Sequence, residues 1–280
     1  MNLRKSHNWK CSKMTRALDI HPTAIVDSSV ELGNTCVVGP YAMIESGAVI
    51  GDNCQIEAHA IIKKRAILGN DVRVGHFAVI GGDPQHLGFD SRVVSSVQIG
   101  DSVRLGEGVT IHRSIYADGV TQIGSQCFLM GYSHVGHDCN LSKEVILANG
   151  ALIGGHVLVG AFTFIGGGAG VHQFVRIGEG AMIGGLAEVS KDVPPQVTVS
   201  GRNLACGLNL IGMKRRKVST LDKTALKHSY RSILMKSGNP VVHAQNCLEE
   251  NLISQSPLAK NFVEFFLAEN KGFVKSKSLN

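Results

Sequence analysis

Aromatic side chains are scarce in this chain of 280 residues: 5% of the positions are Phe, Tyr or Trp, with a single Trp. A globular core built mainly from packed rings is therefore excluded. No uninterrupted apolar run reaches the roughly 20 residues of a membrane-spanning helix, so no membrane span is expected. Gly is abundant, at 33 residues, yet it follows no collagen period. With 44% hydrophobic residues, the sequence predicts a core of Ile, Val, Leu and Ala.

The placement of cysteine does not indicate a disulfide scaffold. Four of the seven Cys occupy positions of a repeat, described below, at which the other residues are small or short-branched: Cys36, Cys54, Cys127 and Cys139. Cys at such positions is interpreted as a small hydrophobe, not as a disulfide half or a metal ligand. This usage favours a reducing compartment, and we expect a cytoplasmic protein.

Acidic residues are missing from the first 18 positions, which instead carry Arg4, Lys5, Lys10, Lys13 and Arg16. A basic, acid-free start can be an organelle presequence. Because this one is short and poor in Ser, we favour a disordered tail over residues 1–17. Without the tail, the net charge of +6 nearly vanishes, so a general nucleic-acid-binding role has little support.

A period of six residues dominates the sequence. Every sixth residue from Ile123 to Val189 is Ile, Leu or Val, and the residue four places later is small or short-branched. The pattern also runs from Ile20 to Ile80 and from Ile99 to Ile111. Short strands joined by tight turns have this period, whereas one long helix or an antiparallel meander does not. Three such hexads make one coil, so the predicted fold is mainly β, a parallel β-helix shaped as a triangular prism.

The repeat is interrupted twice and then ends. Residues 81–98 and 112–122 break the period, and we expect them to be loops that leave the prism, where function is commonly carried. Pro194-Pro195 ends the regular repeat. The predicted organisation is therefore a prism over residues 18–200, followed by a connection and a small helical domain over residues 201–280.

Three helices are predicted in the C-terminal part. The first begins at Ser219, which has Asp222 three residues later as a modest capping signal, and runs to about Met235. The second follows Gly238-Asn239-Pro240 and ends near Ser254, and the third spans residues 257–270.

Residues that are three hexads apart in the sequence occupy the same place on successive coils, and we call such a set a column. The columns bring several polar side chains together. His137, Gly155 and Gln173 share one column, and Asp138 and His156 share the next. Adjacent coils are about 4.8 Å apart, so these columns predict a patch. One His alone is most often solvated surface, but several in one patch indicate a site. The residues predicted to form it are His134, His137, Asp138, Gly155, His156, His172 and Gln173.

Several motifs occur in a fixed order along the chain. They are Ile111-His112-Arg113, His134-Val-Gly-His137-Asp138-Cys, Gly155-His156-Val, Val171-His172-Gln173-Phe, Asp192-Val-Pro-Pro195 and Gly207-Leu-Asn209 followed by Lys214-Arg215-Arg216. From about residue 18 to the end, the chain resembles the acyl-[acyl carrier protein]–UDP-N-acetylglucosamine O-acyltransferases, hexapeptide-repeat enzymes that open lipid A synthesis. The resemblance implies a left-handed coil, an exception to the usual right-handed crossover. It also implies a homotrimer with active sites between subunits.

The resemblance implies a role for the central residues of the patch. Acyl transfer to a sugar hydroxyl needs a base, and a neutral imidazole suits this near pH 7; His137 is the expected base. Asp138 is expected to fix that imidazole, although neighbouring strand residues point to opposite sides and Asp138 could instead be only a turn residue. The backbone N–H of Gly155 is the expected donor to the oxyanion.

The substrates implied are UDP-N-acetylglucosamine and a 3-hydroxyacyl chain carried on the phosphopantetheine of acyl carrier protein, with no other cofactor and no metal. Arg215 and Arg216 are expected to bind the UDP phosphates, although a basic run is more often a solvated face. Gly185 is expected to lie where the acyl tail ends and so to set its length. The remaining expected substrate contacts are Gln85, His134, His156, His172, Gln173 and Asn209.

The first insertion departs from the family pattern. Where a Gln-Asp-Leu-Lys-Tyr motif is expected, the chain has Gln85-His86-Leu-Gly88-Phe89, and Ile211 replaces an expected Glu near the nucleotide. These changes leave the general chemistry but open a second acceptor, a 3-amino UDP-sugar that would be acylated to an amide.

Two other readings come from different classes, and a third is an enzyme closely related to the favoured one. A γ-type carbonic anhydrase has a similar prism and holds zinc with three His between subunits, but it would leave Gln173 and the Arg pair without a role. A non-catalytic scaffold would not need a convergent His and Asp patch. A related N-acyltransferase of the same pathway normally carries an additional N-terminal domain, for which residues 1–18 leave no room.

Overall fold

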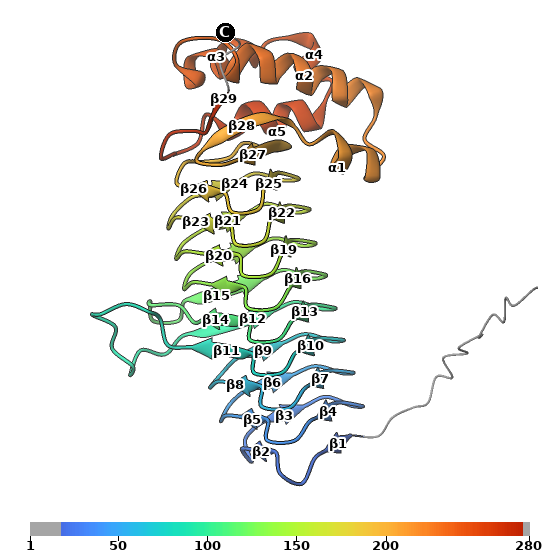
Figure 1. Cartoon of the computed structure of the whole chain (residues 1–280), viewed down its shortest axis with the longest axis vertical. Coiled ribbons are helices and arrows are strands. Elements are labelled where there is room, and N and C mark those ends of the chain that lie inside the picture. Colours follow the sequence, from blue (N-terminus) through green and yellow to red (C-terminus); the bar gives the residue numbers. More distant parts are fainter. Residues whose placement is uncertain (1–17, 277–280) are drawn as a thin grey trace, which may run out of the picture.

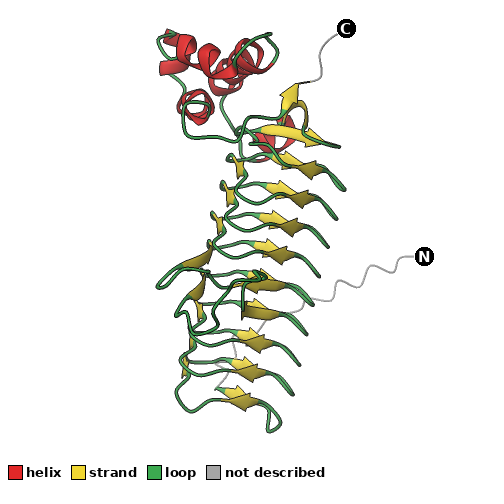
Figure 2. Cartoon of the chain, turned by 90° about the vertical axis from the view of Figure 1, so that its left-hand side faces the viewer, coloured by secondary structure: helices red, strands yellow, loops and turns green. Residues whose placement is uncertain are grey.

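The computed structural model describes residues 18–276, and the predicted tail over residues 1–17 lies outside them. The chain forms a left-handed parallel β-helix, with stacked coils along one axis and helices at one end (Figures 1 and 2). Neighbouring strands within each sheet are parallel, apart from the antiparallel pair β27–β28. The predicted fold class is confirmed. No helix in the described range is long and apolar enough to cross a membrane.

Three sheets form the walls of the prism, and each takes one strand from every coil. Sheet A contains β1 (Asp19–Ile20), β4 (Val37–Val38), β7 (Gln55–Ile56), β10 (Arg73–Val74), β13 (Arg104–Leu105), β16 (Phe128–Leu129), β19 (Ile146–Leu147), β22 (Phe164–Ile165), β25 (Met182–Ile183), β27 (Val197–Ser200), β28 (Leu204–Leu208) and β29 (Lys275–Ser276). Sheet B contains β2 (Ile25–Val26), β5 (Met43–Ile44), β8 (Ile61–Ile62), β11 (Val79–Gly82), β14 (Thr110–His112), β17 (His134–Val135), β20 (Leu152–Ile153), β23 (Gly170–Val171) and β26 (Glu188–Val189). Sheet C contains β3 (Glu31–Leu32), β6 (Val49–Ile50), β9 (Ile67–Leu68), β12 (Ser96–Ile99), β15 (Val120–Ile123), β18 (Asn140–Leu141), β21 (Leu158–Val159) and β24 (Arg176–Ile177).

The six-residue period places one aliphatic and one small side chain of each hexad inside the prism. Ile153 and Val157, for example, are fully buried, as are their counterparts on the coils above and below. The four Cys at small-residue positions are buried and free, which confirms their reading as small hydrophobes. Burial raises the pKa of the Cys139 thiol to about 12, so this thiol stays protonated and unreactive.

The chain turns at three corners, which we name AB, BC and CA after the sheets they join. Most turns contain a residue with positive φ, such as Tyr132 at corner AB (58°), His156 at corner BC (60°) and Phe162 at corner CA (61°). This left-handed conformation is uncommon outside Gly, Asn and Asp. Here the ladder of strand hydrogen bonds on either side of each corner holds it in place.

Both insertions leave the prism at corner BC. Most coils contain three hexads; His134, for example, pairs with Leu152 on the next coil. Two coils are longer. One separates Val79 from its strand partner Thr110, and the next separates Thr110 from its strand partner His134. The first insertion is the loop that projects at the level of β11 and β14 in Figure 1. It is shorter than the predicted range 81–98, because β11 reaches Gly82 and β12 begins at Ser96. The second, predicted over residues 112–122, lies between β14 and β15.

The C-terminal part differs in detail from the prediction. Its helices are α1 (Leu210–Arg215), α2 (Thr220–Leu234), α3 (Pro240–Cys247), α4 (Asn251–Ser254) and α5 (Pro257–Phe265). The predicted second helix is therefore divided, and the third ends earlier than residue 270. In addition, β28 and β29 extend sheet A, so the boundary expected at residue 200 falls inside a sheet.

An ion pair ties the helices to the prism. Nε of Arg176 lies 2.8 Å from Oδ2 of Asp192, whose side chain is almost fully buried. The same guanidinium donates to the backbone carbonyl of Phe265 and lies over its ring, 4.4 Å from the centroid. The motif Asp192-Val-Pro-Pro therefore has a structural role where α5 meets the last coils.

Candidate active site

His137 and Asp138 form a hydrogen-bonded pair at corner BC, directly after β17. Asp138 has a φ of 61°, so its side chain is turned toward that of the preceding residue. Nδ1 of His137 lies 2.7 Å from Oδ2 of Asp138. An ionised carboxylate only accepts hydrogen bonds, so Nδ1 carries the proton and Nε2 is left as the free acceptor. Asp138 is therefore more than a turn residue.

Asp138 is held by further donors that the sequence reasoning missed. The hydroxyl of Ser114 donates to Oδ1, and the backbone N–H of Ile115 donates to Oδ2 at 3.2 Å. The backbone N–H of Asp138 donates to Oγ1 of Thr121 at 2.7 Å. Ser114 and Thr121 are fully buried. Ser114 and Ile115 belong to the second insertion and Thr121 to β15, which follows it, so the insertion and the strand that it leads into position the acidic member of the pair.

His156 stands one coil above Asp138, as the columns predict. Its ring is perpendicular to that of His137 at a centroid distance of 4.9 Å, and it stacks on Phe174 at 4.4 Å. Burial lowers its pKa, and the neighbouring His137 adds to this effect, while Asp138 opposes it. His156 therefore shapes one wall of the site next to the His137 ring.

Gly155 lies against the face of the His137 imidazole. A Cβ at this position would come within 2.7 Å of Cε1 and 2.8 Å of Nε2 of that ring. A residue with any side chain would therefore displace the imidazole. The backbone N–H of Gly155 donates to no acceptor in residues 18–276, which leaves it free for a substrate oxygen.

His134 is kept neutral by its surroundings. Its Nδ1 lies 2.8 Å from Oγ1 of Thr110, and its ring is 5.1 Å from that of His112. Burial lowers the pKa of His134 to about 4, and the repulsion from His112 contributes. A neutral imidazole at this position can donate or accept a hydrogen bond without adding charge to the site.

A shallow hollow of about 680 Å³ lies on the outer face of sheet B beside this corner. Gln85, His134 and His172 line it, together with Glu188 and the backbone of Gly154. The first insertion thus brings Gln85 to the predicted patch. Gln173 follows His172 on the coil above Gly155, and its backbone carbonyl lies 3.2 Å from Nδ1 of His172.

The predicted nucleotide-binding residues lie at a different corner of the same chain. Arg216 pairs with Glu179, 3.2 Å away, and its guanidinium lies over the ring of Phe162 at corner CA. A hollow of about 680 Å³ adjoins it. Arg215 is exposed. Asn209 caps α1, because its Oδ1 accepts from the backbone N–H of Gly212 at 2.9 Å. One chain alone therefore does not bring Arg216 to His137.

Gly185 lies at corner AB, where Leu186 has the positive φ. A Cβ on Gly185 would meet nothing closer than the carbonyl oxygen of Gly167, at 3.4 Å. The space beside Gly185 is therefore open. Like the Arg216 region, it is at a different corner from the His137–Asp138 pair.

A metal ion could find ligand atoms of His137, Asp138 and His156 within 4.8 Å of one another. The carboxylate oxygens of Asp138 already accept hydrogen bonds from His137, Ser114 and Ile115. The arrangement is thus better suited to moving a proton than to binding zinc.

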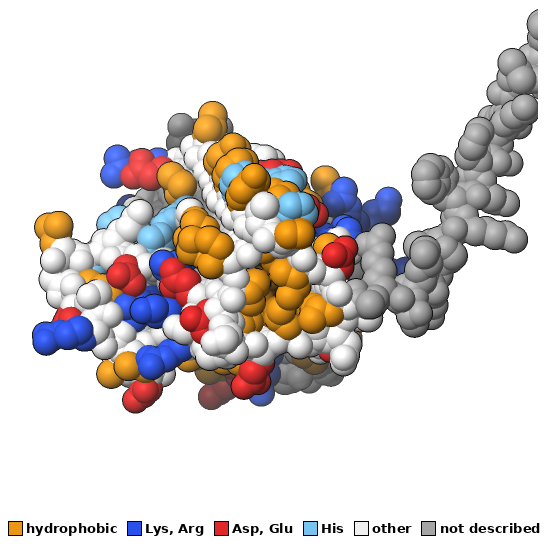
Figure 3. Space-filling model, turned by 90° about the horizontal axis from the view of Figure 1, so that it is seen from below, with side chains coloured by type: hydrophobic (Ala, Val, Ile, Leu, Met, Phe, Trp, Pro, Cys, Tyr) orange, Lys and Arg blue, Asp and Glu red, His pale blue; other side chains and the backbone are white. Residues whose placement is uncertain are grey.

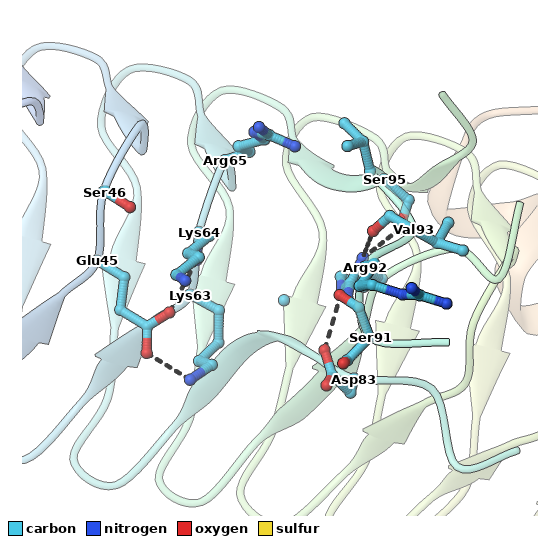
Figure 4. Close-up of a pocket in the computed structure, with 13 residues that line it drawn as sticks. Glu45, Ser46, Lys63, Lys64, Arg65, Asp83, Ser91, Arg92, Val93 and Ser95 are labelled. Carbon is cyan, nitrogen blue, oxygen red and sulfur yellow. Dashed lines mark hydrogen bonds and ion pairs between the residues drawn. The ribbon is translucent and has the colours of Figure 1, made fainter. Parts of the chain in front are cut away.

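A separate, basic pocket of about 520 Å³ lies beneath the first insertion (Figure 4). Most of its cations are already paired: Lys63 with Glu45, Arg92 with Asp90, and Arg113 with Asp83. Arg113 also donates to Ser95 Oγ and to the carbonyls of residues 91 and 93. Arg113 thus fastens the insertion to the coil that carries Ser114.

Two family models match the chain. One, described as "Udp N-acetylglucosamine O-acyltransferase; Domain 2", matches residues 192–274. The other, "Bacterial transferase hexapeptide (six repeats)", matches residues 47–82. Together with the prism and its His–Asp pair, these matches define a hexapeptide-repeat acyltransferase.

Solved structures narrow the class. The UDP-N-acetylglucosamine acyltransferase of Francisella novicida is 30% identical, with a TM-score of 0.87 over 92% of this chain and 94% of that one. That of Campylobacter jejuni is 34% identical, with a TM-score of 0.84 over 92% and 100%. That of Arabidopsis is 28% identical, with a TM-score of 0.80 over 91% and 100%. The chain belongs to the UDP-N-acetylglucosamine acyltransferase family.

Proposed function

We propose that this acyltransferase moves a 3-hydroxyacyl chain from acyl carrier protein to the 3-hydroxyl of UDP-N-acetylglucosamine, the step that opens lipid A synthesis. The observation that carries the proposal is the His137–Asp138 pair with Gly155 against the imidazole face. A general base and a free backbone donor meet there at one point, as acyl transfer from a thioester requires.

The proposed reaction has two proton transfers. Nε2 of His137 takes the proton of the sugar hydroxyl as its oxygen attacks the thioester carbonyl. The new C–O bond leaves an oxyanion, to which the N–H of Gly155 donates. The C–S bond then breaks, and the imidazolium gives its proton to the departing phosphopantetheine sulfur. Asp138 stabilises that imidazolium and keeps the ring in one orientation.

The proposed assembly is a homotrimer, because one chain places the required groups at different corners. A neighbouring copy would bring Arg216, Arg215 and Asn209 to His137. The outer face of sheet B supports close packing between copies: the outward residues of its first four strands are Ile25, Met43, Ile61 and Val79, all at least partly exposed.

An aromatic row adds to this apolar surface. Tyr41, His59 and Phe77 stack along corner AB at centroid distances of 5.1 and 5.0 Å, and both Tyr41 and Phe77 are exposed. Hydrophobic side chains gather on the end of the molecule seen in Figure 3. Contiguous exposed apolar surface of this kind marks contact sites.

The acceptor is tested directly by mass spectrometry of the products. Purified protein is given a panel of 3-hydroxyacyl carrier proteins with UDP-N-acetylglucosamine or with its 3-amino analogue. An ester on the 3-hydroxyl, lost in His137→Ala, is the expected result. Acylation of the amino analogue alone would instead assign the His86, Gly88 and Ile211 departures to a changed acceptor, and no product with either sugar would refute the proposal.

A further inference from the structure

Two cations in the basic pocket beneath the first insertion have no acidic partner. They are Lys64 and Arg65, in the turn that follows β8. Both are exposed, and neither forms an ion pair with a carboxylate in residues 18–276. The other cations that line the pocket, Lys63, Arg92 and Arg113, are each paired with a carboxylate. The pocket therefore keeps the two positive charges of Lys64 and Arg65.

Two hydroxyl groups of the same pocket are also unused. The turn with Lys64 and Arg65 stands on one side of the pocket and residues 91–95 of the insertion stand on the other (Figure 4). The hydroxyls of Ser46 and Ser91 form no hydrogen bond among the described residues. The hydroxyl of Ser95, in contrast, binds the carbonyl of residue 114 and the guanidinium of residue 113. Each side of the pocket therefore offers a free donor.

We propose that this pocket binds a diphosphate group, held by Lys64, Arg65 and Ser46 from the prism and by Ser91 from the insertion. The planar guanidinium of Arg65 suits bidentate contact with phosphoryl oxygens, and Lys64 adds a point charge. Because the ligand contacts both sides, its binding fastens the first insertion to the prism. The pocket is separate from the predicted nucleotide-binding residues at corner CA, and the inference does not depend on the proposed function.

The lining of the pocket favours a diphosphate over other anionic ligands. Among the described residues that line it there is no aromatic ring, so a nucleobase has nothing on which to stack. Its large apolar side chains are those of Val93 and Val94, so a lipid tail or an amphipathic helix could bury little surface there. A single phosphate group is small for a volume of about 520 Å³, whereas two linked phosphoryl groups can contact both sides at once.

The test measures binding of inorganic pyrophosphate to the intact protein by isothermal titration, with no sugar nucleotide present. Lys64→Glu/Arg65→Glu should weaken this binding about tenfold or more, because charge-assisted hydrogen bonds are replaced by repulsion. Arg65→Lys should weaken it less, since it keeps the charge and loses the bidentate fork. Inorganic phosphate should bind the wild type more weakly than pyrophosphate. In hydrogen exchange, pyrophosphate should protect backbone amides of residues 83–95 in the wild type.

Arg73→Glu/Arg104→Glu is the matched control, because these two exposed cations are strand partners on sheet A and do not line the pocket. It should leave the affinity for pyrophosphate unchanged. Arg216→Ala should keep the binding as well, which separates this pocket from corner CA.

Unchanged affinity in Lys64→Glu/Arg65→Glu would overturn the inference, and so would equal losses in the two double variants, which would reduce the effect to net charge. Loss of all pyrophosphate binding in Arg216→Ala, or equal affinity of the wild type for phosphate and pyrophosphate, would overturn it too. A smaller assembly of Lys64→Glu/Arg65→Glu in gel filtration would show instead that the pocket receives a neighbouring copy of the chain.

Discussion

The hydroxyl of Ser114 donates a hydrogen bond to Oδ1 of Asp138, a residue 24 positions later in the chain. A Cβ at Gly119 would come within 2.1 Å of that hydroxyl oxygen, so Gly119 leaves the space that Ser114 occupies. The second insertion is therefore shaped around one hydrogen bond to the acidic partner of His137. Ser114 acts through Asp138, and we regard it as a positioning residue.

Ser114→Ala should lower kcat about tenfold or more, since hydrogen bonds to charged groups are worth about 1.5–3 kcal/mol, while KM for the sugar changes little. Ser133→Ala is the matched control, because Ser133 is equally buried and its hydroxyl has no partner among the described residues. Steady-state kinetics of both variants check the prediction. Equal effects of the two changes would reduce Ser114 to a packing role.

His137→Ala should lower kcat by about 10²–10⁴, the usual contribution of a general base. The fold should persist, because the core beneath consists of buried aliphatics such as Val135 and Ile153. Product formation and the unfolding temperature are measured on the same preparation. Near-normal turnover by a folded variant would remove His137 from the mechanism.

Arg216→Ala should weaken binding of UDP-N-acetylglucosamine more than binding of the acyl donor, with only partial rescue by Lys, which lacks the bidentate fork. Some loss of stability should accompany it, because Arg216 also bonds the buried side chain of Gln196. Arg215→Ala makes no such structural change, so it separates the two effects. Isothermal titration and thermal unfolding are the measurements. Wild-type affinity in both variants would return this basic run to a solvated surface.

Gly185→Met should shift the preference toward shorter 3-hydroxyacyl donors. The nearest atom to an added Cβ is 3.4 Å away, so the side chain fits the fold and extends into the open space. Each methylene denied burial is worth about 0.8 kcal/mol, so blocking several should reverse the preference. Competition between long and short donors gives the ratio, and an unchanged ratio would dissociate Gly185 from the acyl chain.

The free energy of unfolding should fall as the pH is lowered from neutral. Over this range His134 stays neutral in the folded state but becomes protonated in the unfolded chain. Burial depresses its folded pKa to about 4 from the ordinary 6.5. The stabilising contribution is therefore complete above pH 6.5 and is lost as the pH falls toward 4, because the unfolded chain takes up the proton first. Denaturant midpoints at pH 7 and pH 5 measure the slope. His134→Gln should flatten it, and an unchanged slope would assign the effect to other groups.

The regular coils could be predicted from the sequence because their period is set by local geometry. With three hexads to each coil, Gly155 falls above His137 and His156 above Asp138, and the structure places them so. Ser114 was missed because its coil contains an insertion. Thr110 pairs with His134, so this coil is one hexad longer than the regular coils, and a column drawn at the regular spacing does not place Ser114 beside Asp138. Alignment of strand ends on both sides of the break would have revealed it.

Side-chain partners outside the repeat could not be predicted in this way. The family resemblance predicts that Asn209 contacts the nucleotide. In the structure its side chain caps α1 and donates a hydrogen bond to the backbone carbonyl of Gly180. The separation of Arg176 and Asp192 in sequence is close to one coil, yet the register alone does not say that they form an ion pair beneath α5. Such contacts depend on how the helices fold back onto the prism.

The placement of both insertions at corner BC gives the prism one edge of variable length and two of fixed length. At corners AB and CA each turn has the same number of residues on every coil up to β25, so a change there would displace a strand and turn its core side chain outward. At corner BC the chain has gained residues twice without loss of register. The second insertion lies on the coil next to His137 and Asp138, and the first lies on the coil before it. Loops of different length therefore border the reactive pair on an edge of the prism whose other two edges keep a constant turn length.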